Sequence, residues 1–160
     1  MEPGAANSSG SRWIRYGPLV FWLAVLFTAS TSGFSAGNTS RFIRPLLRWL
    51  FPKLSEPEID SVHFMVRKAA HFTGYAILGF VARRAFISST REMIRRYWFW
   101  WASLLVVLYA LFDEWHQSFV PTRTGSIYDS AIDIAGGLTV LVIMKILYRQ
   151  NDPRTHTKVH

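Results

Sequence analysis

The chain has 160 residues, of which half are hydrophobic and 18% are charged, and its formal net charge is +8. This length predicts one domain. Because the sequence contains no cysteine, disulfide bonds, cysteine-ligated metal sites and a thiol nucleophile are excluded. The basic charge could indicate nucleic acid binding. In so apolar a chain it favours lysine and arginine beside anionic lipid, and we expect no nucleic acid partner.

Four apolar segments follow one another, and each approaches the roughly 20 residues that a membrane-spanning helix needs. They cover about residues 16–32, 69–86, 97–120 and 127–148. We therefore predict an all-α fold: an integral membrane bundle of about four transmembrane helices over residues 16–148, with polar tails at 1–15 and 149–160. A soluble helical protein is the alternative, but it would have to hide all of these runs in one small core.

The first apolar segment could also be a signal peptide. Arg12 and Arg15 precede the apolar stretch 19–29, and a weak cleavage motif follows at 34–36. In either case the chain after this segment emerges on the far side of the membrane, so the rest of the topology prediction is unchanged.

Lysine and arginine in the short loops predict the orientation of the bundle. The loop between the second and third segments contains Arg83, Arg84, Arg91, Arg95 and Arg96. Placing this loop in the cytoplasm puts both termini inside (N-in, C-in), makes the C-terminal tail cytoplasmic, and leaves residues 33–68 outside. The external stretch is also basic, which weakens the assignment. Within it, RFIRPLLRWLFPKL at 41–54 predicts an amphipathic helix on the membrane surface that begins near Pro45 and ends at Pro52.

Polar residues of the second segment fall on one helix face. Lys68, His71 and Tyr75 are three and four residues apart, with Gly79 one turn further on. His63 precedes them in the external stretch and is expected in solvent. This face predicts the polar side of one helix of the bundle, at its outer end.

The third and fourth segments carry the complementary polar residues at the same end. Asp113, Glu114 and Gln117 lie near the end of the third segment, and the turn and fourth segment add Arg123, Ser126 and Asp129. A charge at the centre of a spanning helix costs about 2.5–3.5 kcal/mol. We therefore expect paired charges here, with Arg123 bridging to Glu114 or Asp129. Asp133, Gly136 and Gly137 share the face of Asp129, and there we expect helix packing, because small residues allow close approach.

Three motifs occur together in this region. They are KAAHFTGY from Lys68 to Tyr75, DEWHQ from Asp113 to Gln117, and FVPTRTGSIYD from Phe119 to Asp129. Over roughly Val66 to Val142 the chain resembles the VanZ-like family of small bacterial membrane proteins, whose namesake is linked to resistance to the lipoglycopeptide teicoplanin. The resemblance implies a multi-pass protein of the bacterial cytoplasmic (inner) membrane. Asp133 departs from the family pattern, which usually has asparagine there.

Ionisable residues inside a membrane mark functional sites by default, and several functions fit this cluster. The first is binding of an anionic lipid or lipid-linked cell-wall precursor head group at the outer leaflet, with a link to glycopeptide resistance. The ligand-binding candidates are Lys68, His71, Tyr75, Asp113, Glu114, Gln117, Arg123, Ser126 and Asp129. Because four spans make a thin bundle, two copies could also pair as a homodimer.

Three alternatives remain. An enzyme could use His71 or Glu114 as a general base on a lipid phosphate or ester, but no nucleophile motif accompanies them. A metal site could use His71, Glu114, His116 and Asp129, but their spacing is not diagnostic, so no metal or cofactor is predicted. The polar groups could also pair only to fix helix packing.

Overall fold

The computed structural model describes residues 6–31, 33, 35–121 and 127–150, and within this part every secondary-structure element is a helix. The helices are α1 (Ala6–Ser30), α2 (Ala36–Leu50), α3 (Glu56–Ile87), α4 (Glu92–Arg96), α5 (Trp98–Gln117) and α6 (Ile127–Gln150). The predicted all-α fold is confirmed. α1 begins inside the stretch that was predicted to be a polar tail, and α3 begins well before the second predicted span.

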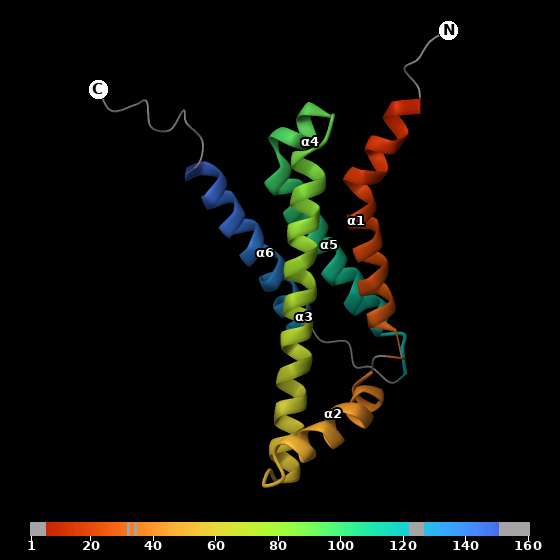
Figure 1. The fold of residues 1–160 in the computed structure, drawn as a ribbon, viewed down its shortest axis with the longest axis vertical. Helices are drawn as coiled ribbons and strands as arrows, with labels where there is room; N and C mark the ends of the chain where they lie inside the picture. Colours follow the sequence, from red (N-terminus) through yellow and green to blue (C-terminus); the bar gives the residue numbers. More distant parts are fainter. Residues whose placement is uncertain (1–5, 32, 34, 122–126, 151–160) are drawn as a thin grey trace, which may run out of the picture.

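The long helix α3 is the axis of the molecule (Figure 1). It contacts each of the other helices, most extensively α6 and then α5 and α1. The start of α1, the short α4 and the end of α6 lie at one end of the molecule, whereas α2 lies at the other (Figure 1). The start of α1 and the end of α6 are therefore at the same end of the bundle.

Small residues bring α3, α5 and α6 together. The core contains Tyr75, Leu78, Ala82, Ala102, Val106, Ala110 and Leu141, all almost fully buried. A Cβ on Gly79 would lie 2.6 Å from the carbonyl oxygen of Gly137, and one on Gly136 would overlap the backbone of Phe72. The close approach of helices predicted at Gly136 and Gly137 is confirmed.

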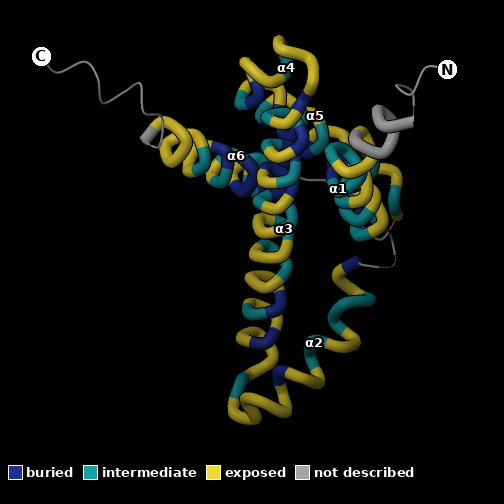
Figure 2. The backbone as a smooth tube through the Cα atoms, turned by 45° about the horizontal axis from the view of Figure 1, so that its top comes forward, coloured by how far each residue is buried: buried dark blue, intermediate teal, exposed yellow. Residues whose placement is uncertain are grey.

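The outer surface of the bundle is rich in large apolar side chains. Exposed examples on α3, α5 and α6 are Phe72, Ile77, Phe80, Trp100, Trp101, Leu104, Leu108, Leu111, Phe112, Trp115, Val142, Ile143, Ile146 and Leu147. Figure 2 shows exposed stretches, in yellow, along α3 and α6. By length and composition, two of the described helices could cross a membrane, over Arg12–Ser30 and Ile127–Arg149. The fold class is thus confirmed as helical, and four membrane spans remain a prediction.

The helix predicted around Pro45 is α2, but its predicted start was wrong. α2 begins at Ala36, where the carbonyl of Ser35 accepts a hydrogen bond from Thr39 N at 2.9 Å, so Pro45 lies in the helix interior. An interior proline removes one backbone hydrogen bond, but its fixed φ is compatible with a helix, so Pro45 is not a reliable start signal. The end at Leu50, shortly before Pro52, agrees with the prediction.

Charged pairs join α2 to the start of α3. Arg44 donates to Glu56 at 2.5 Å and to Asp60 at 2.8 Å, and Arg48 donates to Glu56 at 2.6 Å. The hydrogen bonds from Arg48 and then Arg44 lower the pKa of Glu56 from its usual value. These pairs are exposed, so each contributes little stability and mainly fixes where α2 docks.

His63 on α3 is buried where α2 packs against this helix, and the expectation that it is solvated was wrong. Its Nε2 lies 3.2 Å from the hydroxyl of Thr39. Burial lowers the pKa of His63, and the charge of Arg67 lowers it further. The contact depends on the docking of α2, a long-range feature that local sequence does not encode.

Candidate functional site

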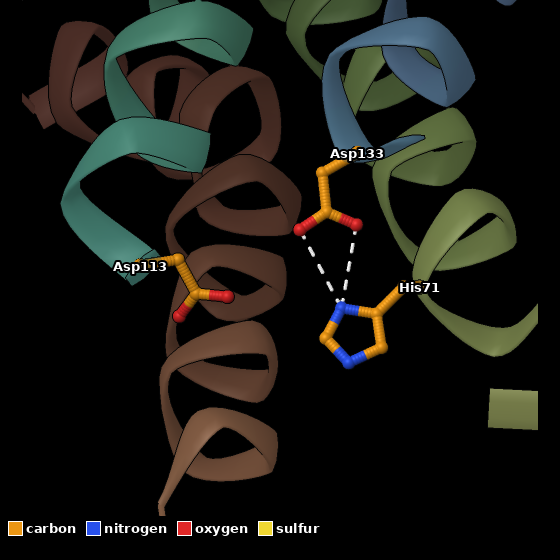
Figure 3. A group of neighbouring side chains, drawn as sticks. All are labelled: His71, Asp113 and Asp133. Atoms are coloured by element: carbon orange, nitrogen blue, oxygen red, sulfur yellow. Dashed lines mark hydrogen bonds and ion pairs between the residues drawn. The ribbon is translucent and has the colours of Figure 1, made fainter. Parts of the chain in front are cut away.

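Three acidic or basic side chains meet where α3, α5 and α6 pack together. His71 comes from α3, Asp113 from α5 and Asp133 from α6, and their side chains point toward one another (Figure 3). Asp133 is fully buried and Asp113 is 4% exposed. One nitrogen of the histidine and one oxygen of each carboxylate all lie within 4.8 Å of one another. Among the residues that the structure describes, these three side chains form a group that could hold a metal ion.

His71 and Asp133 contact each other directly within this trio. The Nδ1 atom of His71 lies 3.3 Å from Oδ1 and 3.4 Å from Oδ2 of Asp133 (Figure 3). Asp113 accepts a hydrogen bond at 3.1 Å from the side-chain amide of Gln117, one turn later on α5. The trio therefore combines a histidine–carboxylate pair with a second carboxylate held by a neutral amide.

Lys68 and Asp129 form a second α3–α6 link, one turn before His71 and Asp133 on their respective helices. Lys68 donates to Asp129 Oδ1 in an ion pair, and the two side chains are 21% and 24% exposed. The ammonium group also lies 5.0 Å from the ring centroid of Phe64. The charge of Lys68 is therefore paired within the protein, by Asp129 and the ring of Phe64.

A cavity of about 180 Å³ adjoins the trio. It is lined by Leu26, Ala29, Ser30, Thr39, Arg67, Ala70, His71, Tyr75 and Asp113, which come from α1, α2, α3 and α5. Three polar atoms of its lining, Ser30 Oγ, Arg67 Nη1 and Tyr75 Oη, are buried without a hydrogen-bond partner in the described part of the chain. All three can donate a hydrogen bond, and leaving buried donors unsatisfied is costly, so the cavity suits a ligand with acceptor oxygens.

Most of the residues predicted from sequence meet at this site. His71, Tyr75 and Asp113 line the cavity, Gln117 donates a hydrogen bond to Asp113, and Lys68 and Asp129 form the neighbouring ion pair. Glu114 is buried at the end of α5 but does not line the cavity. Arg123 and Ser126 lie outside the described residues, and so does the bridge predicted for Arg123.

The residues weighed for a metal site are arranged differently. The ring of His116 packs against Phe27, with centroids 4.9 Å apart, and also stacks on Phe112. Neither His116 nor Glu114 belongs to the metal-compatible group of the described chain, whose members are His71, Asp113 and Asp133. The carboxylates near His71 that could bind a metal are therefore those of Asp113 and Asp133, and not the side chains of Glu114, His116 and Asp129 that the sequence had suggested.

Sequence reasoning left four residues out of the site. Asp133 was expected only to pack, and Ser30, Thr39 and Arg67 were not considered as site residues. The four-residue spacing from Asp129 to Asp133 was a usable signal, since it places both carboxylates on one face of α6. Ser30 and Thr39 flank the loop between α1 and α2, and no local pattern marks them as parts of a cavity.

The structure defines an all-helical protein with an apolar exterior and a cluster of charged side chains in its interior. The family model VanZ/LLP1 matches residues 16–148, which is most of the chain, and the chain belongs to this family. The resemblance found in the sequence is confirmed. No curated protein and no solved structure matches the chain.

Proposed function

We propose that this VanZ-family protein binds the phosphate head group of an anionic lipid or lipid-linked cell-wall precursor in the cavity beside Arg67. One observation carries the proposal. Ser30, Arg67 and Tyr75 all line this cavity, each has a buried polar atom without a hydrogen-bond partner in the described part of the chain, and all three atoms can donate to phosphate oxygens.

Arg67 is the cation best placed to recognise the head group. Arg67 lines the cavity, and its Nη1 atom is buried without a hydrogen-bond partner in the described part of the chain. A guanidinium offers a planar set of donors that matches phosphate geometry. Lys68, which the sequence suggested for this role, already pairs with Asp129.

The size and lining of the cavity support a lipid ligand. A buried cavity of about 150 Å³ accommodates a molecule as large as benzene, and this cavity measures about 180 Å³. Leu26, Ala29 and Ala70 give it an apolar wall next to the polar groups. A ligand with a phosphate and an apolar stem would satisfy both kinds of surface.

The same proposal places α1, α3, α5 and α6 across the bacterial cytoplasmic membrane. The exposed apolar residues of α3, α5 and α6 would then contact lipid, and α2, with Phe42, Trp49 and Leu50 exposed, would lie at the outer surface. The start of α1 and the end of α6 share one end with α4 (Figure 1). This arrangement supports termini on the same side, and the arginines near α4 favour the cytoplasmic side. The cavity would open toward the outer leaflet.

Topology can be tested with reporter fusions. We expect a fusion at Arg91, beside α4, to report a cytoplasmic location and a fusion at Thr122 to report the opposite side. Paired alkaline phosphatase and fluorescent protein fusions measure this directly. An external signal at Arg91 would reverse the orientation and move the cavity to the inner leaflet.

Head-group binding can be tested by replacing Arg67 with glutamine. Hydrogen bonds to charged groups contribute roughly 1.5–3 kcal/mol, so affinity for phosphatidylglycerol should fall about 10- to 100-fold. Native mass spectrometry of the purified protein, titrated with phosphatidylglycerol and phosphatidylcholine, measures retention of each lipid.

The matched control is Arg84→Gln, since Arg84 is an exposed arginine near the other end of α3. It should bind phosphatidylglycerol as the wild type does. Equal affinity in Arg67→Gln and wild type would contradict the proposal. If a cell-wall precursor binds more tightly than phosphatidylglycerol, a link to glycopeptide resistance becomes testable by comparing teicoplanin sensitivity with and without the gene.

A second candidate function is catalysis on a lipid phosphate or ester. The pair of His71 and the buried Asp133 favours it, because a carboxylate that orients an imidazole is a common arrangement of a general base. Turnover of a defined phospholipid or polyprenyl phosphate, lost in a folded His71→Ala variant, would support it. Lipid binding without turnover would support the binding function and contradict the enzymatic one.

A further inference from the structure

We propose that His71, Asp113 and Asp133 bind one divalent cation where α3, α5 and α6 meet. Each helix contributes one ligand, and the ligand atoms lie within 4.8 Å of one another (Figure 3). The inference stands independently of head-group binding, because it concerns different atoms and is tested with the metal alone.

The charge of the buried carboxylates supports a cation. Asp133 is fully buried, and its Oδ1 atom forms no hydrogen bond in the described part of the chain. Asp113 is held by the neutral amide of Gln117, and no described lysine or arginine forms an ion pair with either aspartate. Two carboxylates in a low-dielectric interior are expensive unless compensated, and a single imidazole cannot neutralise both.

The spacing of His71 and Asp133 also fits coordination. A charge-assisted hydrogen bond between nitrogen and a carboxylate is usually about 2.7–2.9 Å long, whereas His71 Nδ1 lies 3.3 and 3.4 Å from the oxygens of Asp133. Two ligands bound at about 2.1 Å are separated by about 3.0 Å at octahedral angles and about 3.4 Å at tetrahedral angles. His71 and Asp133 are therefore spaced like neighbouring ligands of one ion.

The ligand types indicate which cation would bind. Imidazole nitrogen with carboxylate oxygen suits Zn²⁺ or Mn²⁺ better than Ca²⁺, which prefers six to eight oxygen ligands. With three protein ligands, the ion would keep open coordination positions. His71 and Asp113 also line the cavity, so these positions would face it.

Metal binding is tested on the full chain, freed of metal with a chelator and held in phosphatidylcholine nanodiscs. Titration with Mn²⁺, followed by electron paramagnetic resonance, should show one tightly bound ion per chain that Zn²⁺ displaces. Pulsed measurements should detect coupling to an imidazole nitrogen. Loss of second-shell groups already lowers metal affinity about 10- to 100-fold, so Asp133→Asn should lower it at least about 100-fold.

The control Asp60→Asn makes the same chemical change at an exposed position near the start of α3 and should bind Mn²⁺ as the wild type does. Wild-type protein that binds no ion, or Asp133→Asn that binds as tightly as wild type, would overturn the proposal. If Asp133→Asn does not fold, the coupling of bound Mn²⁺ to an imidazole nitrogen in the wild type tests whether the ion binds at this site. Its absence from a bound ion would place the ion elsewhere.

Discussion

Replacing Gly136 with alanine is expected to push α6 away from α3. A Cβ at this position would overlap the carbonyl oxygen of Phe72, which belongs to the backbone and cannot rotate away as a side chain can. Overpacking of a core costs about 1–3 kcal/mol, and a clash with backbone should lie at the upper end of that range. Thermal unfolding of the purified variant in detergent, followed by circular dichroism, should show a clearly lower Tm.

The matched control for this variant is Gly37→Ala in α2, where an added Cβ would meet nothing within 4 Å. Alanine favours a helix over glycine by up to about 1 kcal/mol, so this variant should keep or raise the wild-type Tm. Equal melting temperatures in Gly136→Ala and wild type would show that the close α3–α6 contact is not needed. The control removes the objection that any Gly→Ala change in this chain alters stability.

Gly136 also couples packing to the site. Asp133 lies three residues before it on α6 and faces His71 on α3. A shift of α6 that relieved the clash would move Asp133 relative to His71. Cation binding should therefore weaken in Gly136→Ala even though no ligand is changed.

Helical spacing predicted the face that α3 presents to α6. Lys68, His71 and Tyr75 are three and four residues apart, and the structure places all three toward the interior or the charged pairs. Such spacing fixes which residues of one helix share a face, but not how deeply that face is buried. This is why Asp133, chemically similar to Asp129 and one turn away, could not be distinguished as the fully buried member.

The cavity could not be predicted from the sequence. Arg67 was read as part of a basic external stretch, and its role depends on α1 and α2 folding back beside α3. Ser30 and Thr39 lie on opposite sides of the loop that makes this return. Contacts of this kind depend on the loop conformation and helix docking, which neither periodicity nor composition specifies.

The number of membrane spans shows a related difficulty. α1 and α6 have the length and the apolar content of spanning helices in the described chain. α3 and α5 carry charged residues that are buried or partly buried, such as Lys68 on α3 and Asp113 and Glu114 on α5. If these charges are satisfied inside the bundle, as the Lys68–Asp129 pair is, such a helix can be less hydrophobic overall and still contact lipid on its other side.

Lys68→Met should destabilise the protein by leaving Asp129 without its partner. Breaking a buried ion pair costs about 3–5 kcal/mol, and the partial exposure of both side chains, 21% and 24%, moves the expectation to the lower end. Replacing both residues, in Lys68→Met with Asp129→Leu, should recover most of the loss, because no uncompensated charge remains. Unfolding measurements on the two single variants and the double variant give the coupling energy through a double-mutant cycle.

Lys145→Met provides the control for removing a lysine from a helix. Lys145 lies 4.0 Å from the ring centroid of Phe99, and cation–π contacts contribute about 0.5–2 kcal/mol. The Lys145→Met variant should lose less stability than Lys68→Met, and adding Asp129→Leu should not restore it. A coupling energy near zero between Lys68 and Asp129 would show that the pair does not hold α3 to α6.

The same variants distinguish two roles for Lys68 in lipid binding. In the structure Lys68 neutralises Asp129, and Asp129 also attracts Arg67 electrostatically. Without Lys68, the unpaired carboxylate should draw the Arg67 guanidinium away from the cavity, so phosphatidylglycerol affinity should fall in Lys68→Met and return in the double variant. If Lys68 instead contacts the head group directly, the double variant should bind as poorly as the single one. Recovery in the double variant would therefore assign the head-group contact to Arg67, with Lys68 keeping Asp129 from competing for it.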